Sequence, residues 1–279
     1  YGYGFTIGGL APADRNVFTG NTSAGIYISG GGAYVENNFI GTANGSTAAA
    51  NGKGIYIANN GGTITDNVIS GNSDVGVYVD NDYGGTAIFG NRIGLNAAKS
   101  GKIANGGGGV YINGGGSLDI IGNLIAGNGV FGIGFIYSYD LNISNNVIGL
   151  SYGGSPLPNT RGIDAYCSGY VSIAGNVIAA NQFEGVLLDG TSGASLVGNT
   201  IGDNGTSGVR IDIGSCYGGD NFLGDNLVTG NKQDGVLITG ASTGNTIYAN
   251  SIHANVRKNI NLNNNPTTLP TDSTDADGG

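Results

Sequence analysis

The chain contains 279 residues, of which 57 are glycine and none is methionine or tryptophan, and its formal net charge is −9. The chain is acidic and poor in lysine and arginine, which argues against nucleic acid as a partner, because nucleic-acid binding depends on basic surface. No apolar run approaches the roughly 20 residues of a membrane span. The hydrophobic content of 39% is too high for a disordered glycine-rich linker, and the glycines lack the Gly-X-Y period of collagen.

The first fifteen residues precede the regular part of the chain and are typical of the end of a coil, with Thr6-Ile-Gly-Gly9 as their strand-like stretch. Tyr1 is typical of a mature or excised piece, so we expect an export signal to be missing from this sequence.

From residue 16 onward two anchors alternate along the chain. The first is an asparagine before a short apolar stretch, and the second is a residue, usually glycine, that begins a short strand. The first anchors are Asn16, Asn38, Asn67, Asn91, Asn123, Asn146, Asn176, Asn199, Asn226 and Asn250. The second anchors are Gly25, Gly54, Gly76, Gly109, Gly132, Gly162, Gly185, Gly208, Gly235 and, in the tenth place, Asn259. Ten of each in strict alternation indicate a solenoid.

The spacing of the anchors sets the size of one coil. Nine residues lead from the first anchor to the second in seven coils, as from Asn16 to Gly25, whereas 16 to 18 residues do so in the second, fourth and sixth coils. Those three coils therefore carry insertions of seven to nine residues. Between the second anchor and the next asparagine there are usually 13 to 15 residues, so the base coil has about 23 residues.

Within each coil the apolar residues alternate, as in Ile55-x-Ile57 and Val77-x-Val79, which predicts strands and no helix. Another apolar residue, such as Ile120, stands three positions before nearly every Asn anchor. The pattern therefore predicts an all-β parallel β-helix. Asparagine tolerates the left-handed turn conformation, and its amide can donate to one coil and accept from another, so the anchors should form an Asn ladder.

Two phrases carry a resemblance to a known family. They are Gly-Asn-x-x-x-Gly-Val-x-Val at 71–79 and Asn-Phe-Ile-Gly at 38–41, the latter continuing through an Ala/Gly/Asn-rich loop to Gly54-Ile55. The chain resembles the right-handed parallel β-helix repeat proteins of the pectin-lyase-like superfamily, especially the repeat arrays of bacterial secreted and cell-surface proteins. The resemblance implies a right-handed single-stranded parallel β-helix of about ten coils. That superfamily includes lyases, hydrolases, epimerases and non-catalytic adhesins, so the resemblance implies no single activity.

The strand positions that point outward are candidates for binding. Two residues after the second anchor, the first four coils place Tyr27, Tyr56, Tyr78 and Tyr111 in one row. We expect this row to form an aromatic stripe that binds sugar rings or a partner protein, walled on one side by the insertions. The alternative is a stack of tyrosines that only stabilises the outer strands.

Carboxylates gather in the later coils. Asp189 and Asp212 stand four residues after their anchors in adjacent coils, with Arg210 close by and Asp164 two coils before it. Paired carboxylates can hydrolyse glycosides, and carboxylates beside an arginine suit a lyase. The alternative is a set of ion pairs on an acidic surface. The Gly-His-Gly and Asp-Pro-His motifs of related glycosidases and epimerases are absent, so the resemblance transfers no catalytic residue.

The cysteines and the tail leave two further questions. Cys167 and Cys216 lie in the turns of the sixth and eighth coils, too far apart for a disulfide unless the extended loop around Cys216 folds back over the coil between them. Two buried thiols are the alternative.

We divide the chain into a β-helix over 1–264 and a polar linker or tail over 265–279. In that tail Asp272, Asp275 and Asp277 could hold Ca²⁺, the one cofactor the sequence leaves open, or form a solvated linker.

These observations favour an extracellular or cell-surface rod with a structural, adhesive or carbohydrate-binding role, as a fragment of a larger surface protein. Its expected partner is a polysaccharide or a cell-surface molecule, with neither nucleic acid nor a membrane span involved. The alternative is a polysaccharide lyase or glycoside hydrolase that uses Asp189, Arg210 and Asp212.

Overall fold

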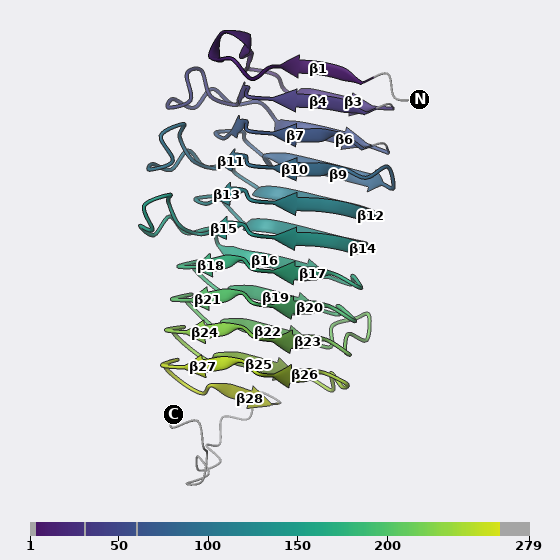
Figure 1. Ribbon diagram of the computed structural model, residues 1–279, viewed down its shortest axis with the longest axis vertical. Coiled ribbons are helices and arrows are strands. Elements are labelled where there is room, and N and C mark those ends of the chain that lie inside the picture. The colour runs from purple at the N-terminus through teal and green to yellow at the C-terminus, as the bar shows by residue number, and fades with distance from the viewer. Residues whose placement is uncertain (1–3, 31, 60, 263–279) are drawn as a thin grey trace.

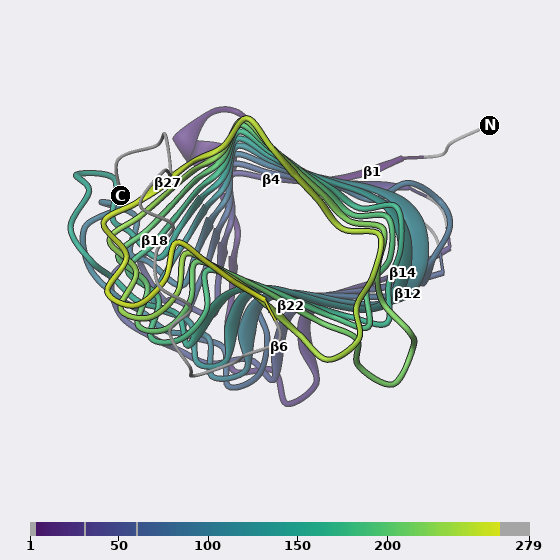
Figure 2. The ribbon, with the colours of Figure 1, turned by 90° about the horizontal axis from the view of Figure 1, so that it is seen from below.

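A computed structural model of the chain describes residues 4–30, 32–59 and 61–262, which form a right-handed parallel β-helix. Figure 1 shows the coils stacked along one long axis. Seen along that axis, the coils superimpose and surround one shared interior (Figure 2). The predicted all-β fold and its number of coils are confirmed, since each side of the rod carries ten strand segments in parallel register.

The strands form three columns, one on each side of the rod. The first column consists of β3 (Ala24–Ser29), β6 (Lys53–Ala58), β9 (Val77–Asp82), β12 (Gly108–Ile121), β14 (Phe131–Ser144), β16 (Arg161–Tyr166), β19 (Val186–Asp189), β22 (Val209–Asp212), β25 (Val236–Thr239) and β28 (Ile260–Leu262). The second column consists of β1 (Phe5–Gly8), β4 (Ala33–Glu36), β7 (Thr63–Thr65), β10 (Ala87–Phe89), the later halves of β12 and β14, β17 (Ser172–Ala174), β20 (Ser195–Val197), β23 (Phe222–Gly224) and β26 (Thr246–Tyr248).

The third column is built from shorter strands. It consists of β2 (Val17–Phe18), β5 (Phe39–Ile40), β8 (Val68–Ile69), β11 (Arg92–Ile93), β13 (Leu124–Ile125), β15 (Val147–Ile148), β18 (Val177–Ala179), β21 (Thr200–Gly202), β24 (Leu227–Thr229) and β27 (Ser251–His253). A 3₁₀ turn, η1 (Pro12–Asp14), is the only helical element among the described residues. None of the described helices has the length and apolarity needed to cross a membrane.

Aligned aliphatic side chains fill the interior. Ile55, Val77, Val110 and Ile133 occupy one register position in four successive strands of the first column, and all four are fully buried. Because adjacent parallel strands lie about 4.8 Å apart, each side chain packs directly on its equivalents in the neighbouring coils. The position three residues before the Asn anchor is also buried as predicted, with Ile120 wholly inaccessible.

The ten Asn anchors form the predicted ladder. Each side-chain amide donates to the Oδ1 of the next anchor over 2.8 to 3.2 Å, from Asn16 through to Asn250. The amide also donates to a backbone carbonyl, as Asn91 does to Ile64 at 2.8 Å. These bonds satisfy polar groups that burial would otherwise leave unpaired.

The expected reason for asparagine at the anchor is wrong in one respect. The left-handed residue is the one before the anchor, such as Asn37 with φ 56° or Asp66 with φ 55°. The anchors from Asn38 to Asn250 have no positive φ, so the ladder alone explains why they are asparagine.

A second Asn ladder runs beside the first and was not predicted. Its amides bond from coil to coil over 2.8 to 3.1 Å. Its members are Asn21, Asn51, Asn72, Asn105, Asn128, Asn159, Asn181, Asn204, Asn231 and Asn255. The sequence carried the signal, since most of these residues stand four positions before the second anchor. The first ladder stands immediately before the strands of the third column and the second ladder follows them, so the two ladders flank that column.

The three insertions occupy 41–50, 94–104 and 149–158, between the two ladders, and they lie on the same side of the rod (Figure 1). They also bond to one another: Ala97 donates its N–H to the carbonyl of Gly45 over 2.7 Å, and Tyr152 donates its N–H to the carbonyl of Lys99 over 3.0 Å. Leu95, at the start of the second insertion, forms a small second core with Leu124 and Ala126 of the third column. The insertions therefore cover the outer face of the third column.

Cys167 and Cys216 form a disulfide, with their Cα atoms 5.4 Å apart. The loop between β22 and β23 folds back by one coil, as the extended spacing suggested. Its Gly214 lies so close to the β19 turn that a Cβ there would be 2.3 Å from Asp189 Oδ1. The alternative of two buried thiols is wrong.

Candidate functional site

The four tyrosines of the predicted stripe occupy one register position on β3, β6, β9 and β12. Their ring centroids are 5.0, 5.1 and 5.5 Å apart in chain order, and the first two contacts are edge-to-face. Such pairs stabilise the outer strands beyond simple burial. Tyr27 is 59% exposed, whereas Tyr56, Tyr78 and Tyr111 are half-buried. The row therefore forms a continuous ladder of rings that remains accessible.

A fifth ring extends this ladder and was not predicted. The next position in the row is Gly134, and Phe131 from three residues earlier places its ring over it, 2.8 Å from where a Cβ would lie. Phe131 stacks on Tyr111 with centroids 5.6 Å apart and an interplanar angle of 27°. We call Tyr27, Tyr56, Tyr78, Tyr111 and Phe131 the aromatic ladder. Gly134 was the sequence signal for this fifth ring, because a glycine has no side chain to occupy the space in which the Phe131 ring lies.

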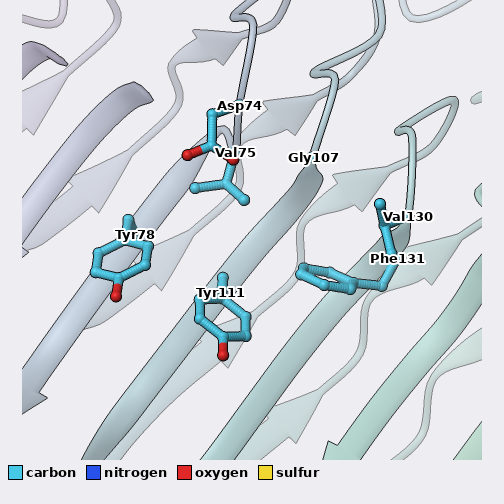
Figure 3. A pocket seen from close by; sticks show the side chains of 7 residues that line it. All are labelled: Asp74, Val75, Tyr78, Gly107, Tyr111, Val130 and Phe131. Carbon is cyan, nitrogen blue, oxygen red and sulfur yellow. The ribbon is translucent and has the colours of Figure 1, made fainter. Parts of the chain in front are cut away.

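A pocket of about 350 Å³ opens at the end of the aromatic ladder (Figure 3). It is lined by the rings of Tyr78, Tyr111 and Phe131, with Asp74, Val75, Gly107 and Val130 from the turns before β9, β12 and β14. No residue of the three insertions lines it, so the expectation that the insertions wall the aromatic stripe is not met. The wall is formed by the turns between the second Asn ladder and the first column.

Polar contacts orient the rings. Tyr56 donates its hydroxyl to Asp80 over 2.9 Å, and this bond, with burial and the charge of Asp80, raises the pKa of Tyr56 to about 12. Burial and the charge of Asp80 also raise the pKa of Tyr78. Lys53 lies 5.1 Å from the Tyr78 centroid and 2.7 Å from Asp74. These contacts hold Tyr56 against Asp80 and place the Asp74 carboxylate at the pocket rim.

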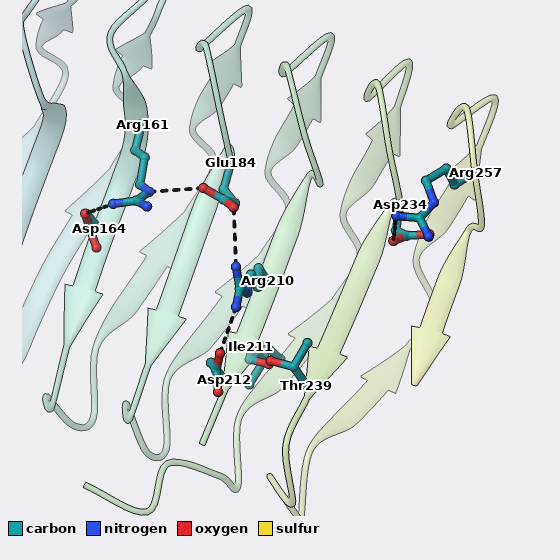
Figure 4. Close-up of polar contacts among 9 residues, drawn as sticks. All are labelled: Arg161, Asp164, Glu184, Arg210, Ile211, Asp212, Asp234, Thr239 and Arg257. Carbon is teal, nitrogen blue, oxygen red and sulfur yellow. Dashed lines mark hydrogen bonds and ion pairs between the residues drawn. The ribbon is translucent and has the colours of Figure 1, made fainter. Parts of the chain in front are cut away.

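Three of the four predicted residues, Asp164, Arg210 and Asp212, belong to a chain of ion pairs on the later strands of the same column (Figure 4). Arg161 contacts Asp164 and Glu184, each at 3.0 Å. Arg210 contacts Glu184 at 3.8 Å and Asp212 at 2.9 Å. Glu184 thus joins the two arginines. We call these five residues the charged network, and it links Asp164 to Asp212 across three successive coils, those of β16, β19 and β22.

Asp189 lies beside the network and forms no ion pair in the described part of the chain. It is level with Asp212 on the neighbouring strand. Burial raises the pKa of Asp189, and repulsion from Asp212 and Asp164 raises it further. Burial would also raise the pKa of Asp212, but hydrogen bonds from Thr239, Arg210 and Gly214 outweigh it and lower that pKa. The pKa values of the two neighbouring carboxyls are therefore shifted in opposite directions.

The metal prediction concerns residues outside those described: Asp272, Asp275 and Asp277 all lie beyond residue 262. Within residues 4–30, 32–59 and 61–262 there is no group of three or more His, Cys, Asp or Glu side chains arranged to hold a metal ion.

Comparison with solved structures gives the same fold at low identity. The A-module of the mannuronan C-5 epimerase AlgE4 of Azotobacter vinelandii aligns with a TM-score of 0.64 and 13% identity, covering 92% of this chain and 80% of that one. PfbA, a surface adhesin of Streptococcus pneumoniae, aligns with a TM-score of 0.55 and 13% identity, covering 88% and 78%. The DFA-IIIase of Arthrobacter chlorophenolicus A6 aligns with a TM-score of 0.54 and 12% identity, covering 86% and 74%.

A sequence comparison with curated proteins gives no match. The family described as the right handed beta helix region matches residues 41–181 and 99–252, which together span most of the chain. With the stacked coils and the Asn ladders, this match shows that the chain belongs to the right-handed β-helix family.

Proposed function

We propose that this protein is an extracellular carbohydrate-binding or adhesive β-helix that binds a glycan along the aromatic ladder. The observation that carries the proposal is the pocket formed by Tyr78, Tyr111 and Phe131 with Asp74 at its rim. Its volume of about 350 Å³ falls in the range of small-ligand sites, and it combines apolar ring surface with a few polar groups.

The contacts of the rings favour a sugar over a purely structural role for the pocket end of the ladder. Tyr27 and Tyr56 meet edge to face and hold one another, whereas Tyr111 and Phe131 lie nearly parallel and line an open hollow. A sugar ring has an apolar face that packs on such surface, and its hydroxyls can donate to a carboxylate such as Asp74. Two of the structurally similar proteins act on or bind carbohydrate by their names, and a third is an adhesin.

A glycan array tests the proposal directly. We expect wild-type protein to bind at least one glycan and the double variant Tyr78→Ala/Tyr111→Ala to lose that binding while remaining folded. Tyr248→Ala is the matched control, because Tyr248 is 67% exposed on β26, away from the ladder. If no glycan binds, or if the double variant binds as well as wild type, the aromatic ladder is scaffold.

The disulfide supports the extracellular part of the proposal. Structural disulfides form and persist in oxidising compartments and are rare in the cytosol. The Cys167–Cys216 pair closes a loop of 49 residues in sequence separation and pins a surface loop, which is a structural use.

A second function, polysaccharide cleavage, rests on the opposite pKa shifts of Asp189 and Asp212. A protonated Asp189 would serve as the acid and an ionised Asp212 as the base. The assay incubates the protein with a panel of polysaccharides, with and without Ca²⁺, and measures reducing ends and unsaturated products. Under this function Asp189→Asn abolishes activity and the exposed Asp203→Asn leaves it unchanged. Absence of products with every substrate would leave the carboxylates as part of the ion-pair surface.

A further inference from the structure

A second cavity, of about 170 Å³, lies on the third column, beneath the insertions. It spans β11, β13 and β15 and is closed by Lys99 from the second insertion and Tyr152 from the third. Arg92 on β11 and Leu124 on β13 also line it. None of its lining residues belongs to the aromatic ladder or to the charged network, so it is a separate feature.

The cations at this cavity lack counter-ions. Among the described residues, Arg92 and Lys99 form no ion pair, although the whole chain has nine more acidic than basic side chains. Arg92 Nε is buried and has no hydrogen-bond partner. A buried donor on a charged group is costly when it is left unpaired. The neighbours of Arg92 in register, Val68 and Leu124, are apolar and offer it no side-chain acceptor.

The other groups around the cavity define what could bind. The Lys99 ammonium lies 4.7 Å from the centroid of Tyr152, whose ring is mostly exposed at the rim. Asp66 does not line the cavity but lies close to the lining residue Gly90, where an added Cβ would be 2.9 Å from its Oδ1. The lining thus combines a guanidinium, an ammonium and an aromatic rim, and one carboxylate lies nearby.

We propose that this cavity is a binding site for a single oxyanion group of the sulfate or carboxylate class. The Arg92 guanidinium supplies parallel N–H donors that match two oxygens of such a group, and Lys99 adds a second positive charge. The volume admits one such group with part of a sugar ring. The exposed Tyr152 ring would contact that sugar when the group is carried on one.

Titration of isotope-labelled protein by NMR at constant ionic strength tests the site. The probes are sodium sulfate, glucose 6-sulfate and, as the neutral match, glucose. We expect sulfate to shift the backbone resonances of Gly122 and Tyr152 in a saturable manner. Tighter binding of glucose 6-sulfate than of sulfate assigns the site to a sulfated sugar, and equal binding assigns it to the free oxyanion. The proposal is overturned if neither charged probe shifts these resonances.

Five variants distinguish a specific anion site from general attraction to positive charge. Arg92→Gln should weaken binding by about tenfold or more, and Arg92→Lys should weaken it nearly as much because the fork of donors is lost. Lys99→Gln should weaken binding, whereas Lys102→Gln should not, since Lys102 belongs to the same insertion and does not line the cavity. Asp66→Asn should tighten binding. Equal effects of Lys99→Gln and Lys102→Gln, or none from Arg92→Lys, would contradict the proposed contacts.

Discussion

The early and late halves of the first column present different surfaces on one scaffold. On β3 to β14 the outward row carries the aromatic ladder and a pocket, whereas on β16 to β22 the same face carries the charged network and the disulfide loop. The register is continuous through both halves, from Tyr111 and Gly134 to Asp164 and beyond. In a solenoid the inward positions repeat because they fill the shared interior, whereas the outward positions are free to change from coil to coil. One scaffold can therefore carry two different surfaces.

The largest expected effect tests whether both halves rest on one interior. Ile112 and Ile211 stand three residues after their anchors, beneath the aromatic ladder and the charged network respectively, and both are fully buried. Ile112→Asp and Ile211→Asp should each lower the free energy of unfolding by more than about 4 kcal/mol, since an unpaired charge would enter the core. Chemical denaturation followed by circular dichroism measures this. A variant that unfolds like wild type would show that its inward assignment is wrong.

The disulfide distinguishes the late half. Replacing both cysteines, as Cys167→Ser/Cys216→Ser, should lower the free energy of unfolding by about 2 to 5 kcal/mol. Hydrogen exchange should rise at 213–221, where the loop is held against the β19 turn, and stay unchanged on β6 and β9. As a control, mass spectrometry of unreduced peptides checks that Cys167 and Cys216 are bonded in the wild-type protein. Uniformly faster exchange along the rod would mean that the bond supports the whole molecule and not the late half.

The ion pairs of the two halves should differ in strength. Glu184 is 7% exposed and contacts two arginines, so Glu184→Gln should cost about 2 kcal/mol by leaving Arg161 and Arg210 without their shared partner. Lys53→Gln breaks a more exposed pair with Asp74 in the early half and should cost less than about 1 kcal/mol. Thermal unfolding of the two variants side by side measures the difference. Equal costs would show that burial of Glu184 adds nothing to its pairs.

The features that were predictable from sequence are those that repeat. Ile120, the Asn anchors and the row of tyrosines follow from the fixed spacing, since every coil must bury the same positions. The second Asn ladder repeats as well, and the Gly-Asn phrase before Gly76 would have revealed it. Phe131 and the loop around Cys216 were harder to predict, because neither follows the repeat. The Phe131 ring lies over the space left by Gly134, and the loop around Cys216 folds back by one coil.

The site predictions fared unevenly for the same reason. The register placed Asp189 beside Asp212 correctly. Spacing alone could not show that Glu184 joins Arg161 to Arg210, since that depends on how long side chains extend over the surface. It also misplaced the insertions, which cover the third column and not the tyrosines, because the length of a loop does not determine the direction in which it folds.

The smallest expected effect concerns Tyr56, the ring of the aromatic ladder whose hydroxyl donates a hydrogen bond to the Asp80 carboxylate. Its pKa is raised to about 12 by the hydrogen bond to Asp80, so the folded state favours the protonated phenol. The resulting stability is fully present below the unfolded pKa of about 10 and is lost as the pH rises through about 12. Tyr56→Phe should therefore cost about 0.5 to 1.5 kcal/mol at neutral pH, and the difference from wild type should shrink between about pH 10 and 12.

The titration of the Tyr56 ζ-carbon by NMR isolates this one group from the other tyrosines. In wild type the midpoint should lie near pH 12. In Asp80→Asn it should fall toward about 10, because the asparagine removes the negative charge that opposes ionisation and weakens the bond to the hydroxyl. A wild-type midpoint near 10 would mean that the bond is absent in solution. The edge-to-face contacts with Tyr27 and Tyr78 would then hold the ring alone, and the pocket end of the aromatic ladder would differ from its beginning only in the open hollow beside Phe131.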